Sequence, residues 1–424
     1  MNSLFKWMLF FVVTFCSGVS FAETAHSELS ISNIMARNAE KTDVILADKS
    51  QKTLYVISAD GDNFTVKASF PIIYGINEGD KKVSGDGKTP EGVYYITSWT
   101  SGESLINRYG NYAKIYGSGA FPLNYPNSVD KIRKKTGHGI WIHGRDPING
   151  KDTTQGCIAL HNEDLMNLYS MIAVKDAVVI TDKALLLSKG EYDALRSELL
   201  GVFDGFINSW QSNDYESFKN YIHNNFKGQG KNAKSYLSSK KYLMEQYKDK
   251  TIKTDNTKIF IQNDNNFLVD TNQFYCAKNV TSYGKKRYYF TKESEGFKLV
   301  SEEAVSLSPN KIISDSINSF LENWAAAWRS GDVDKYAEFY SENFKNGKMN
   351  KSAWYNYKKD VFQKAGTISV ELSDISWSAE NNLYKAYFIQ KYSGGSVSDI
   401  GIKTLVFDGC PDNFKIISET WTAN

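Results

Sequence analysis

The sequence has few cysteines and histidines, with 4 Cys and 5 His among 424 residues. This scarcity excludes a small disulfide-stabilised domain. The chain has no Cys-x-x-Cys and no His-Glu-x-x-His motif, so it predicts no metal site and no cofactor. Its formal net charge of +2 provides no broad basic field, and we expect no nucleic-acid partner.

Long apolar runs are also lacking after residue 22, where nothing approaches the length of a membrane span. Residues 1–22 combine Lys6, an apolar stretch and Ser20-Phe21-Ala22, a pattern typical of a cleaved secretory signal peptide. We therefore expect export to the periplasm of a Gram-negative cell envelope. No stable membrane insertion is expected after the signal is cleaved.

Three cysteines remain beyond the signal peptide, and an odd number leaves at least one free thiol. Cys157 is the natural candidate. Cys276 and Cys410 could form a disulfide in an oxidising compartment. We favour the alternative interpretation, in which both are small buried side chains without a covalent bond.

Cys157 follows Gly156, and His143 precedes Gly144 fourteen residues upstream. A thiol becomes a strong nucleophile as the thiolate, and a nearby imidazole can remove its proton and later protonate the leaving group. We predict Cys157 as the nucleophile and His143 as the base. The backbone N–H groups of Gly156 and Cys157 could form an oxyanion hole, and Thr154 either binds substrate or holds the turn.

These residues resemble the signature of the YkuD-type L,D-transpeptidase family, also called the ErfK/YbiS/YcfS/YnhG group. The turn Thr89-Pro90-Glu91-Gly92 is similar to a second motif of that family. Ala159 departs from the signature, because cross-linking members usually carry arginine there. Alanine at this position resembles the branch of L,D-carboxypeptidases and murein hydrolases involved in cell shape. The positions that match the signature are His143, Gly144, Thr154, Gly156, Cys157, Ile158 and Leu160.

The resemblance implies a fold and a reaction. The fold is a mainly β catalytic domain, a YkuD-like β-sandwich with short helices, in which the Gly144 carbonyl orients the histidine. The substrates would be peptidoglycan stem peptides, with glycan strands as a further partner. Attack on the meso-diaminopimelate–D-alanine bond would give a Cys thioester and release D-alanine.

The sequence leaves three functions of this site open. Because Ala159 lacks a guanidinium, we favour hydrolysis, which is L,D-carboxypeptidase activity in cell-wall remodelling and cell shape. The alternative is an L,D-transpeptidase that forms 3-3 cross-links or attaches or detaches a lipoprotein. The second alternative is a non-catalytic wall-binding scaffold, against which the intact Cys157 and His143 argue.

Other polar residues near these motifs have weaker interpretations. His138 and His143 lie five apart, which on one strand places them on opposite faces and disfavours a zinc site with His161. We interpret His138 as a wall of the cleft that could contact substrate. Tyr112 and Tyr116 are further candidates for the cleft wall. The basic run of Lys131, Arg133, Lys134 and Lys135 is either a solvated face or a site for stem-peptide carboxylates.

The second half of the chain contains a repeat with an offset of 118 residues, which aligns Trp210 with Trp328 and Tyr236 with Trp354. Each copy begins with a long amphipathic helix, and the pattern resembles two NTF2-like α+β cone domains. We expect the first cone to pack beside the catalytic cleft and hold the substrate. The sequence does not fix the oligomeric state.

The predicted organisation follows from these patterns. The apolar residues within 23–40 show weak helical spacing. Strands are expected to follow this segment. Asn162 is expected to cap a helix, and residues 183–191 to form a linker. The predicted segments are a signal peptide at 1–22, an N-terminal segment at 23–40, a YkuD-like catalytic domain at 41–187, and NTF2-like domains at 188–306 and 307–424.

Overall fold

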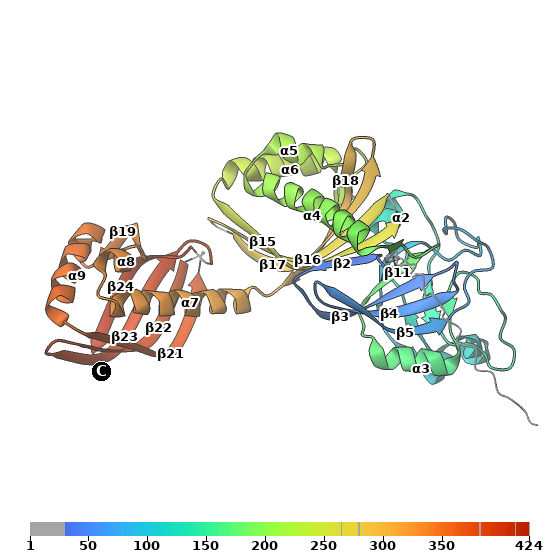
Figure 1. Ribbon diagram of the computed structural model, residues 1–424, viewed down its shortest axis with the longest axis horizontal. Helices are drawn as coiled ribbons and strands as arrows, with labels where there is room; N and C mark the ends of the chain where they lie inside the picture. Colours follow the sequence, from blue (N-terminus) through green and yellow to red (C-terminus); the bar gives the residue numbers. More distant parts are fainter. Residues whose placement is uncertain (1–29, 264, 279, 381–382, 412, 424) are drawn as a thin grey trace, which may run out of the picture.

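The computed structural model describes residues 30–263, 265–278, 280–380, 383–411 and 413–423 (Figure 1). The predicted signal peptide lies outside these residues. Three bodies follow one another along the chain: a β-sandwich, a first cone from α4 to β18, and a second cone from α7 to β24. In Figure 1 the second cone lies apart at one end, and the sandwich and the first cone pack together at the other.

Two β-sheets form the sandwich, and its main apolar core lies between them. The larger sheet has the order β5-β4-β3-β11-β6, in which only the β3–β11 pair is parallel. The smaller sheet has the order β10-β9-β8-β7, in which only the β9–β10 pair is parallel. The strands are β3 (Ala39–Asp48), β4 (Thr53–Gly61), β5 (Asn63–Pro71), β6 (Gly92–Tyr95), β7 (Thr100–Ser101), β8 (Gly119–Pro122), β9 (Trp141–His143), β10 (Ile158–Ala159) and β11 (Ala177–Thr181).

Short helices connect these strands, as the sequence predicts for a mainly β domain. They are α1 (Gly102–Tyr109), the 3-10 helix η1 (Gly110–Tyr116), α2 (Ser128–Ile132) and α3 (Asn162–Met171). His161 occupies the N-cap position of α3 without a capping hydrogen bond from its side chain, so the prediction that Asn162 is the cap is wrong by one residue. The Asn162 side chain instead accepts hydrogen bonds from the N–H groups of Ser118 and Arg145.

The first cone has the order β18-β17-β16-β15-β2, so its last strand comes from the beginning of the chain. Ile34 in β2 pairs with Phe260 in β15. The helical spacing predicted for residues 23–40 is therefore wrong over the described part, which forms strands. The predicted linker at 183–191 is also partly wrong, because β12 and the start of α4 lie in it. The elements are β1 (Ser30–Ile31), β2 (Ile34–Arg37), β12 (Leu186–Leu187), α4 (Lys189–Gln211), α5 (Tyr215–Asn220), β13 (Lys227–Gly228), β14 (Lys231–Asn232), α6 (Ala233–Gln246), β15 (Lys250–Asn263), β16 (Asn266–Ala277), β17 (Val280–Glu293) and β18 (Gly296–Leu307).

The second cone repeats this plan with a six-stranded sheet of order β20-β19-β24-β23-β22-β21. A disulfide joins Cys276 at the end of β16 to Cys410 after β23, and so connects the two cones. The favoured interpretation of these cysteines as unlinked buried side chains is therefore wrong. The elements are α7 (Asn310–Arg329), α8 (Val333–Ala337), β19 (Tyr340–Asn346), β20 (Met349–Asn350), α9 (Lys351–Ala365), β21 (Ile368–Glu380), β22 (Leu383–Gly394), β23 (Val397–Asp408) and β24 (Lys415–Ala423).

The sandwich and the first cone share one apolar cluster. Strand β11 is buried at every position, and Val44, Leu46 and Val179 on the larger sheet pack in the same cluster as Phe260 and Leu268 of the cone. Because both faces of β11 are covered, its sequence is a continuous apolar run without alternation. We call this cluster the shared layer.

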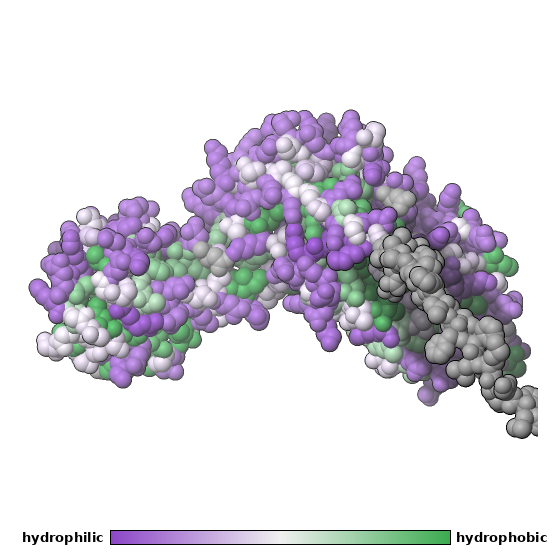
Figure 2. Space-filling model, in the orientation of Figure 1, coloured by the Kyte–Doolittle hydropathy of each residue, from purple (hydrophilic) through white to green (hydrophobic). Residues whose placement is uncertain are grey.

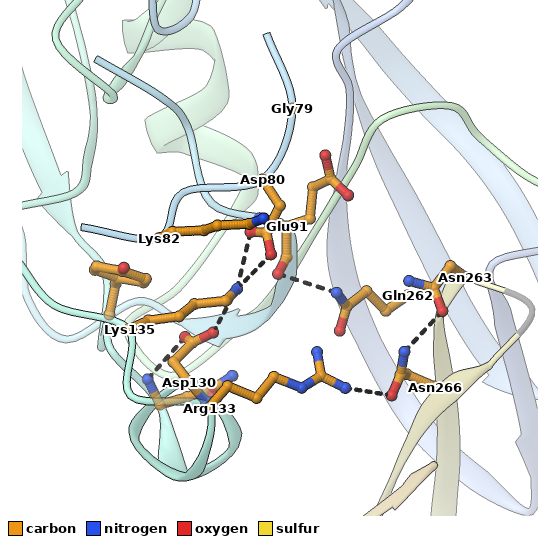
Figure 3. Close-up of polar contacts among 12 residues, drawn as sticks. Gly79, Asp80, Lys82, Glu91, Asp130, Arg133, Lys135, Gln262, Asn263 and Asn266 are labelled. Atoms are coloured by element: carbon orange, nitrogen blue, oxygen red, sulfur yellow. Dashed lines mark hydrogen bonds and ion pairs between the residues drawn. The ribbon is translucent and has the colours of Figure 1, made fainter. Parts of the chain in front are cut away.

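Polar contacts surround the shared layer (Figure 3). Gln262 of the cone donates to the Glu91 carbonyl at 3.1 Å, and Arg133 donates to Asn266 at 2.6 Å. Tyr95 donates to the Asp270 carboxylate at 2.7 Å, and the Arg287 guanidinium lies 3.3 Å from the centre of the Tyr95 ring. These contacts fix the orientation of the cone on the sandwich.

The four basic residues between 131 and 135 form neither a single solvated face nor a single site for stem-peptide carboxylates. Lys135 is buried and forms ion pairs with Asp80 at 2.7 Å and Asp130 at 2.9 Å, as Figure 3 shows. Arg133 contacts the first cone. Lys131 and Lys134 are exposed and match the solvated face. None of the four lines the large cleft described below.

The outer surface is polar over most of the face in Figure 2, where apolar patches are interrupted by hydrophilic residues. Over the described parts of the chain, no helix combines the length and the apolar character that a membrane crossing needs.

The shared layer predicts that the sandwich needs the first cone to fold. Each buried aliphatic side chain contributes about 1.5–3 kcal/mol, and domains of this size are stable by only about 5–15 kcal/mol. Exposing Val44, Leu46 and Val179 together should therefore remove most of the stability. We expect residues 23–187 alone to show no cooperative thermal transition by circular dichroism.

The matched control is residues 23–306, in which the shared layer is intact. This fragment should unfold cooperatively, within a few degrees of the same transition in the full chain. A cooperatively folded 23–187 fragment would show that the cone is not needed to complete the sandwich.

Candidate active site

A cleft of about 540 Å³ opens on the smaller sheet of the sandwich, a volume typical of small-ligand sites. Every described residue that lines it comes from the sandwich. We expect the first cone to pack beside the cleft and hold the substrate. That cone packs on the opposite sheet and none of its described residues lines the cleft, so its substrate-holding role stays a prediction. The lining includes Ile73, Lys81, Tyr112, Tyr116, His138, Gly139, His143, Arg145, Lys151, Thr154, Cys157 and Ala159.

His143 ends strand β9, and its ring is buried. Its Nδ1 lies 2.5 Å from the Gly144 carbonyl oxygen. A carbonyl only accepts hydrogen bonds, so Nδ1 carries the proton and Nε2 presents a lone pair. Burial lowers the pKa of His143 to about 4, and the positive charge of Arg145 acts in the same direction. The imidazole is therefore neutral at ordinary pH and able to accept a proton.

Tyr116 holds His143 from the side. The two rings meet edge to face with their centres 5.1 Å apart, and the Tyr116 carbonyl accepts the N–H of Gly144 at 3.1 Å. Helix η1 thus fixes both the imidazole and the backbone that orients it. The prediction that Tyr112 and Tyr116 line the cleft is confirmed for both.

Cys157 immediately precedes strand β10, which lies parallel to β9 with Ala159 beside His143. Its thiol donates to the Gly139 carbonyl at 3.4 Å. Burial raises the pKa of Cys157 to about 11, although the N–H of Trp141 and the charge of Lys81 lower it in part. The side chain is only partly accessible and has no disulfide partner. In the free protein the sulfur is therefore a neutral thiol.

The turn before Cys157 is held by Thr154. Its hydroxyl donates to the Cys157 carbonyl at 2.7 Å and accepts the Gly156 N–H at 3.0 Å. Of the two roles predicted for Thr154, the structure shows the one in the turn. The same contact occupies the Gly156 N–H, so the prediction that this group points to an oxyanion is wrong for this state.

Gly156 is required by the turn itself. Its φ of +127° is a conformation that side chains rarely adopt, and a Cβ atom there would lie 2.6 Å from the Lys88 carbonyl. The close neighbour is thus the chain's own backbone. Lys88 directly precedes the turn of the second motif, in which the buried Thr89 hydroxyl accepts the Gly75 N–H at 2.9 Å.

Ala159 is buried and hydrogen-bonds through its backbone to Ile73. A cation still reaches this part of the cleft, because Arg145 follows the His-Gly motif and lines the same space. The Nε of Arg145 is buried and has no hydrogen-bond partner. Its backbone is fixed on both sides by the Asn162 amide, through Oδ1 at 3.1 Å and Nδ2 at 3.0 Å.

The two other histidines considered from the sequence, His138 and His161, differ in their position relative to the cleft. His138 is exposed on the cleft wall, as predicted, and His161 lies outside the lining at the start of α3. Over the described residues, no group of three His, Cys, Asp or Glu side chains is arranged to hold a metal ion. Lys81 pairs with Asp86 at 2.7 Å and keeps the pKa of that carboxyl well below its usual range.

Sequence reasoning missed Arg145 and Lys81. Arg145 carries a usable signal, since it directly follows the His-Gly motif. Lys81 has none, because it reaches the cleft only through the folding of the 73–85 loop.

Comparison of the chain with known protein families identifies its domains. Residues 42–180 match the model of the YkuD family, described as the L,D-transpeptidase catalytic domain. Residues 199–303 and 316–420 both match the Cds6 C-terminal NTF2-like domain. No curated protein matches the chain.

Solved structures resemble about two thirds of this chain. Bd1075 of Bdellovibrio bacteriovorus is 29% identical with a TM-score of 0.58, over 66% of this chain and 99% of that chain. The helical cell shape determining protein Pgp2 from Campylobacter jejuni is 27% identical with a TM-score of 0.53, over 64% of this chain and 95% of that chain. The chain thus carries a YkuD-type L,D-transpeptidase catalytic domain followed by two Cds6 C-terminal NTF2-like domains.

Proposed function

We propose that this chain is a periplasmic enzyme that cleaves the meso-diaminopimelate–D-alanine bond of peptidoglycan stem peptides, with Cys157 as nucleophile and His143 as base. The observation that carries the proposal is the Nδ1 contact of His143 with the Gly144 carbonyl, which leaves Nε2 free to accept a proton in the cleft of Cys157.

The chemistry follows from these groups. The imidazole takes the thiol proton, and the sulfur attacks the carbonyl carbon. When the tetrahedral intermediate collapses, the C–N bond breaks and the imidazolium gives its proton to the departing D-alanine amine. Water then attacks the thioester as its proton passes to His143. The C–S bond breaks, the imidazolium returns the proton to the Cys157 sulfur, and the tripeptide leaves with a free carboxylate. The Cys157 N–H is the candidate donor to the oxyanion, since Gly156 donates to Thr154.

Cationic side chains in the cleft suit an anionic substrate. Arg145, Lys81 and Lys151 line it, and the buried Nε of Arg145 lacks a partner. A substrate carboxylate beside Arg145 would supply one. His138 is exposed in the same cleft and is accessible to the same peptide.

We favour hydrolysis over transfer. Ala159 presents only a methyl group beside His143, so this position offers no charge to organise an acceptor chain. The name of Pgp2 connects a similar structure with helical cell shape, and we extend a role in cell shape to this chain. Formation of 3-3 cross-links, attachment or detachment of a lipoprotein, and a non-catalytic scaffold remain the alternatives that the product analysis separates.

The first prediction tests the nucleophile and the base. Cys157→Ala and His143→Ala should each lower the release of D-alanine from tetrapeptide muropeptides by at least about 10³-fold, since each removes one member of a coupled unit. The exposed His161, outside the cleft, provides the control, and His161→Ala should keep activity within about twofold. Mass spectrometry of the products gives the readout.

The products also separate the alternatives. Tripeptides with free carboxylates support hydrolysis, and 3-3 dimers support transfer. Full activity in Cys157→Ala would reject the mechanism. A wild-type chain inactive on both muropeptides and sacculi would favour the scaffold.

The second prediction concerns the resting state of the thiol. With a pKa near 11 for Cys157 and near 4 for His143, both groups are neutral between about pH 5 and pH 9. Alkylation by iodoacetamide should therefore rise about tenfold per pH unit from pH 7 to pH 10. In His143→Ala the profile should be nearly the same. A plateau near neutral pH that disappears in His143→Ala would instead indicate a thiolate–imidazolium pair.

The third prediction concerns Arg145. Loss of a hydrogen bond to a charged group costs about 1.5–3 kcal/mol, so Arg145→Gln should lower kcat/KM about 10- to 150-fold, mainly through KM. Arg145→Lys keeps the charge without the forked donors and should recover part of the loss. Lys151→Gln removes an exposed charge from the same cleft and should change kcat/KM less than about threefold. Equal effects of the Arg145 and Lys151 changes would contradict a specific contact.

A further inference from the structure

A polar groove of about 1050 Å³ lies between the two cones. The first cone contributes the end of α4, the start of β15 and the end of β16, and the second contributes the start of β22 and the turn from β23 to β24. The Cys276–Cys410 disulfide joins the cones at this groove, and Cys410 is part of its wall. The core residues Trp210 and Trp328 do not line it, so the groove lies outside the interior of either cone.

The charged side chains of the groove are mixed in sign. Four lysines and two aspartates among the described lining residues give it a net charge of +2 at neutral pH. A purely basic surface would suit any anion, whereas a mixed surface suits a ligand that carries both signs of charge. The charged residues are Lys248, Asp249, Lys250, Lys278, Asp408 and Lys415.

Lys250 is a cation without a counter-charge. Its ammonium donates to the Asn213 side chain and to the Tyr247 carbonyl, and both of these acceptors are neutral. Burial lowers the pKa of Lys250 to about 8, and no carboxylate among the described residues opposes this effect. At Lys358, by comparison, burial also lowers the pKa but the nearby Glu419 carboxylate opposes it. Lys250 therefore lacks an anion that would stabilise its charge.

Asp408 is the opposite case, on the second cone. Burial raises the pKa of its carboxyl, its own backbone N–H opposes the shift in part, and no described cation does so. Lys415 lies directly across the β23–β24 pair, but its ammonium donates to the Glu338 carbonyl. Within the described chain, Asp408 and Lys250 pair neither with each other nor with another charged side chain. The groove thus holds one desolvated cation and one desolvated anion, each without a partner, which is unfavourable in the free protein.

Two exposed lysines extend the positive side of the groove. Lys250 pairs with Ala277 across β15 and β16, which brings Lys278 next to Lys250 in the sheet. Lys248 lies two residues before Lys250, and the exposed Asp249 between them offsets one of these charges. The positive charge therefore gathers on the first cone, and the desolvated carboxylate faces it from the second.

We propose that this groove binds the meso-diaminopimelate part of wall stem peptides. The carboxylates would lie against Lys250 and its neighbouring lysines, and the ammonium would lie against Asp408. After D-alanine release, the N-acetylated tripeptide L-Ala–γ-D-Glu–meso-diaminopimelate carries three carboxylates and one ammonium, so its net charge is opposite to that of the groove. A phosphate or a run of glutamates offers no cation for Asp408. The choice of wall peptides as the source rests on the proposed function.

Calorimetry on the full chain with this N-acetyl tripeptide tests the proposal. Free Lys250 is half protonated at pH 8, and a bound carboxylate should raise its pKa. Binding should therefore take up about half a proton at pH 8 and almost none at pH 6, where Lys250 is already protonated. The uptake is measured from the dependence of the binding enthalpy on the ionisation enthalpy of the buffer. Lys250→Met should abolish it.

Two other peptides separate the possible ligands. The tripeptide with L-lysine in place of diaminopimelate lacks the carboxylate beside the ammonium, and N-acetyl-triglutamate lacks the ammonium. Each should bind at least about fivefold more weakly than the diaminopimelate tripeptide. Equal or tighter binding of the triglutamate would assign the groove to acidic protein segments and overturn the wall ligand.

Variants at exposed or half-buried positions test both sides of the groove without a loss of packing. Asp408→Asn, and Lys248→Gln together with Lys278→Gln, should each weaken binding of the tripeptide at least about fivefold. The matched control is Lys359→Gln together with Lys385→Gln, which removes two charges from exposed positions of the second cone outside the groove. This control should leave binding unchanged.

The catalytic cleft is distinguished by Arg145→Gln, which alters that cleft only and should keep the proton uptake. No saturable binding of the tripeptide at about 10 mM, or unchanged binding in both groove variants, would overturn the proposal. Failure of the proposed function would show differently, as a wild-type chain that releases no D-alanine from muropeptides. D-alanine release from small muropeptides should be the same in the Lys248→Gln and Lys278→Gln double variant as in the wild type.

Discussion

The architecture depends on the shared layer, in which the larger sheet of the sandwich packs against the sheet of the first cone. Strand β11 is buried on both faces and cannot tolerate water on either side. One of its faces packs in the sandwich core and the other in the shared layer. The cone is therefore part of the scaffold that supports the enzyme, although none of its described residues lines the active-site cleft.

This arrangement leaves the smaller sheet free for chemistry. In its parallel pair β9–β10, His143 ends one strand and Cys157 directly precedes the other. Contacts of Thr154 and Gly144 fix the backbone at both residues. Burial disfavours the charged forms of the Cys157 thiol and the His143 imidazole, so both groups are neutral at rest. The cleft around them is also lined by the cations Lys81 and Arg145. A neutral thiol also resists oxidation better than a thiolate does.

The sequence predicts most of what is local. Motifs carried by adjacent residues identify Cys157, His143 and the carbonyl of Gly144, and alternating apolar residues predict the strands. The 118-residue repeat in the sequence alone indicates the two cones. What it does not reveal are contacts between distant segments, such as β2 with β15 or Cys276 with Cys410, because no local pattern specifies a partner. The occupied Gly156 N–H and the position of Lys81 likewise depend on how turns close in space.

The insertion of β2 into the cone has a consequence for the order of folding. A chain is made from its N-terminus, and domains generally fold as units in that order. Here Ile34 must wait for Phe260, so β2 cannot pair until β15 of the first cone has been made. Closing so long a loop is slow compared with forming a local hairpin. An interrupted chain would leave β2 unpaired and the shared layer open to water, which marks it for proteolysis. Only a chain synthesised beyond β18 can close the shared layer completely.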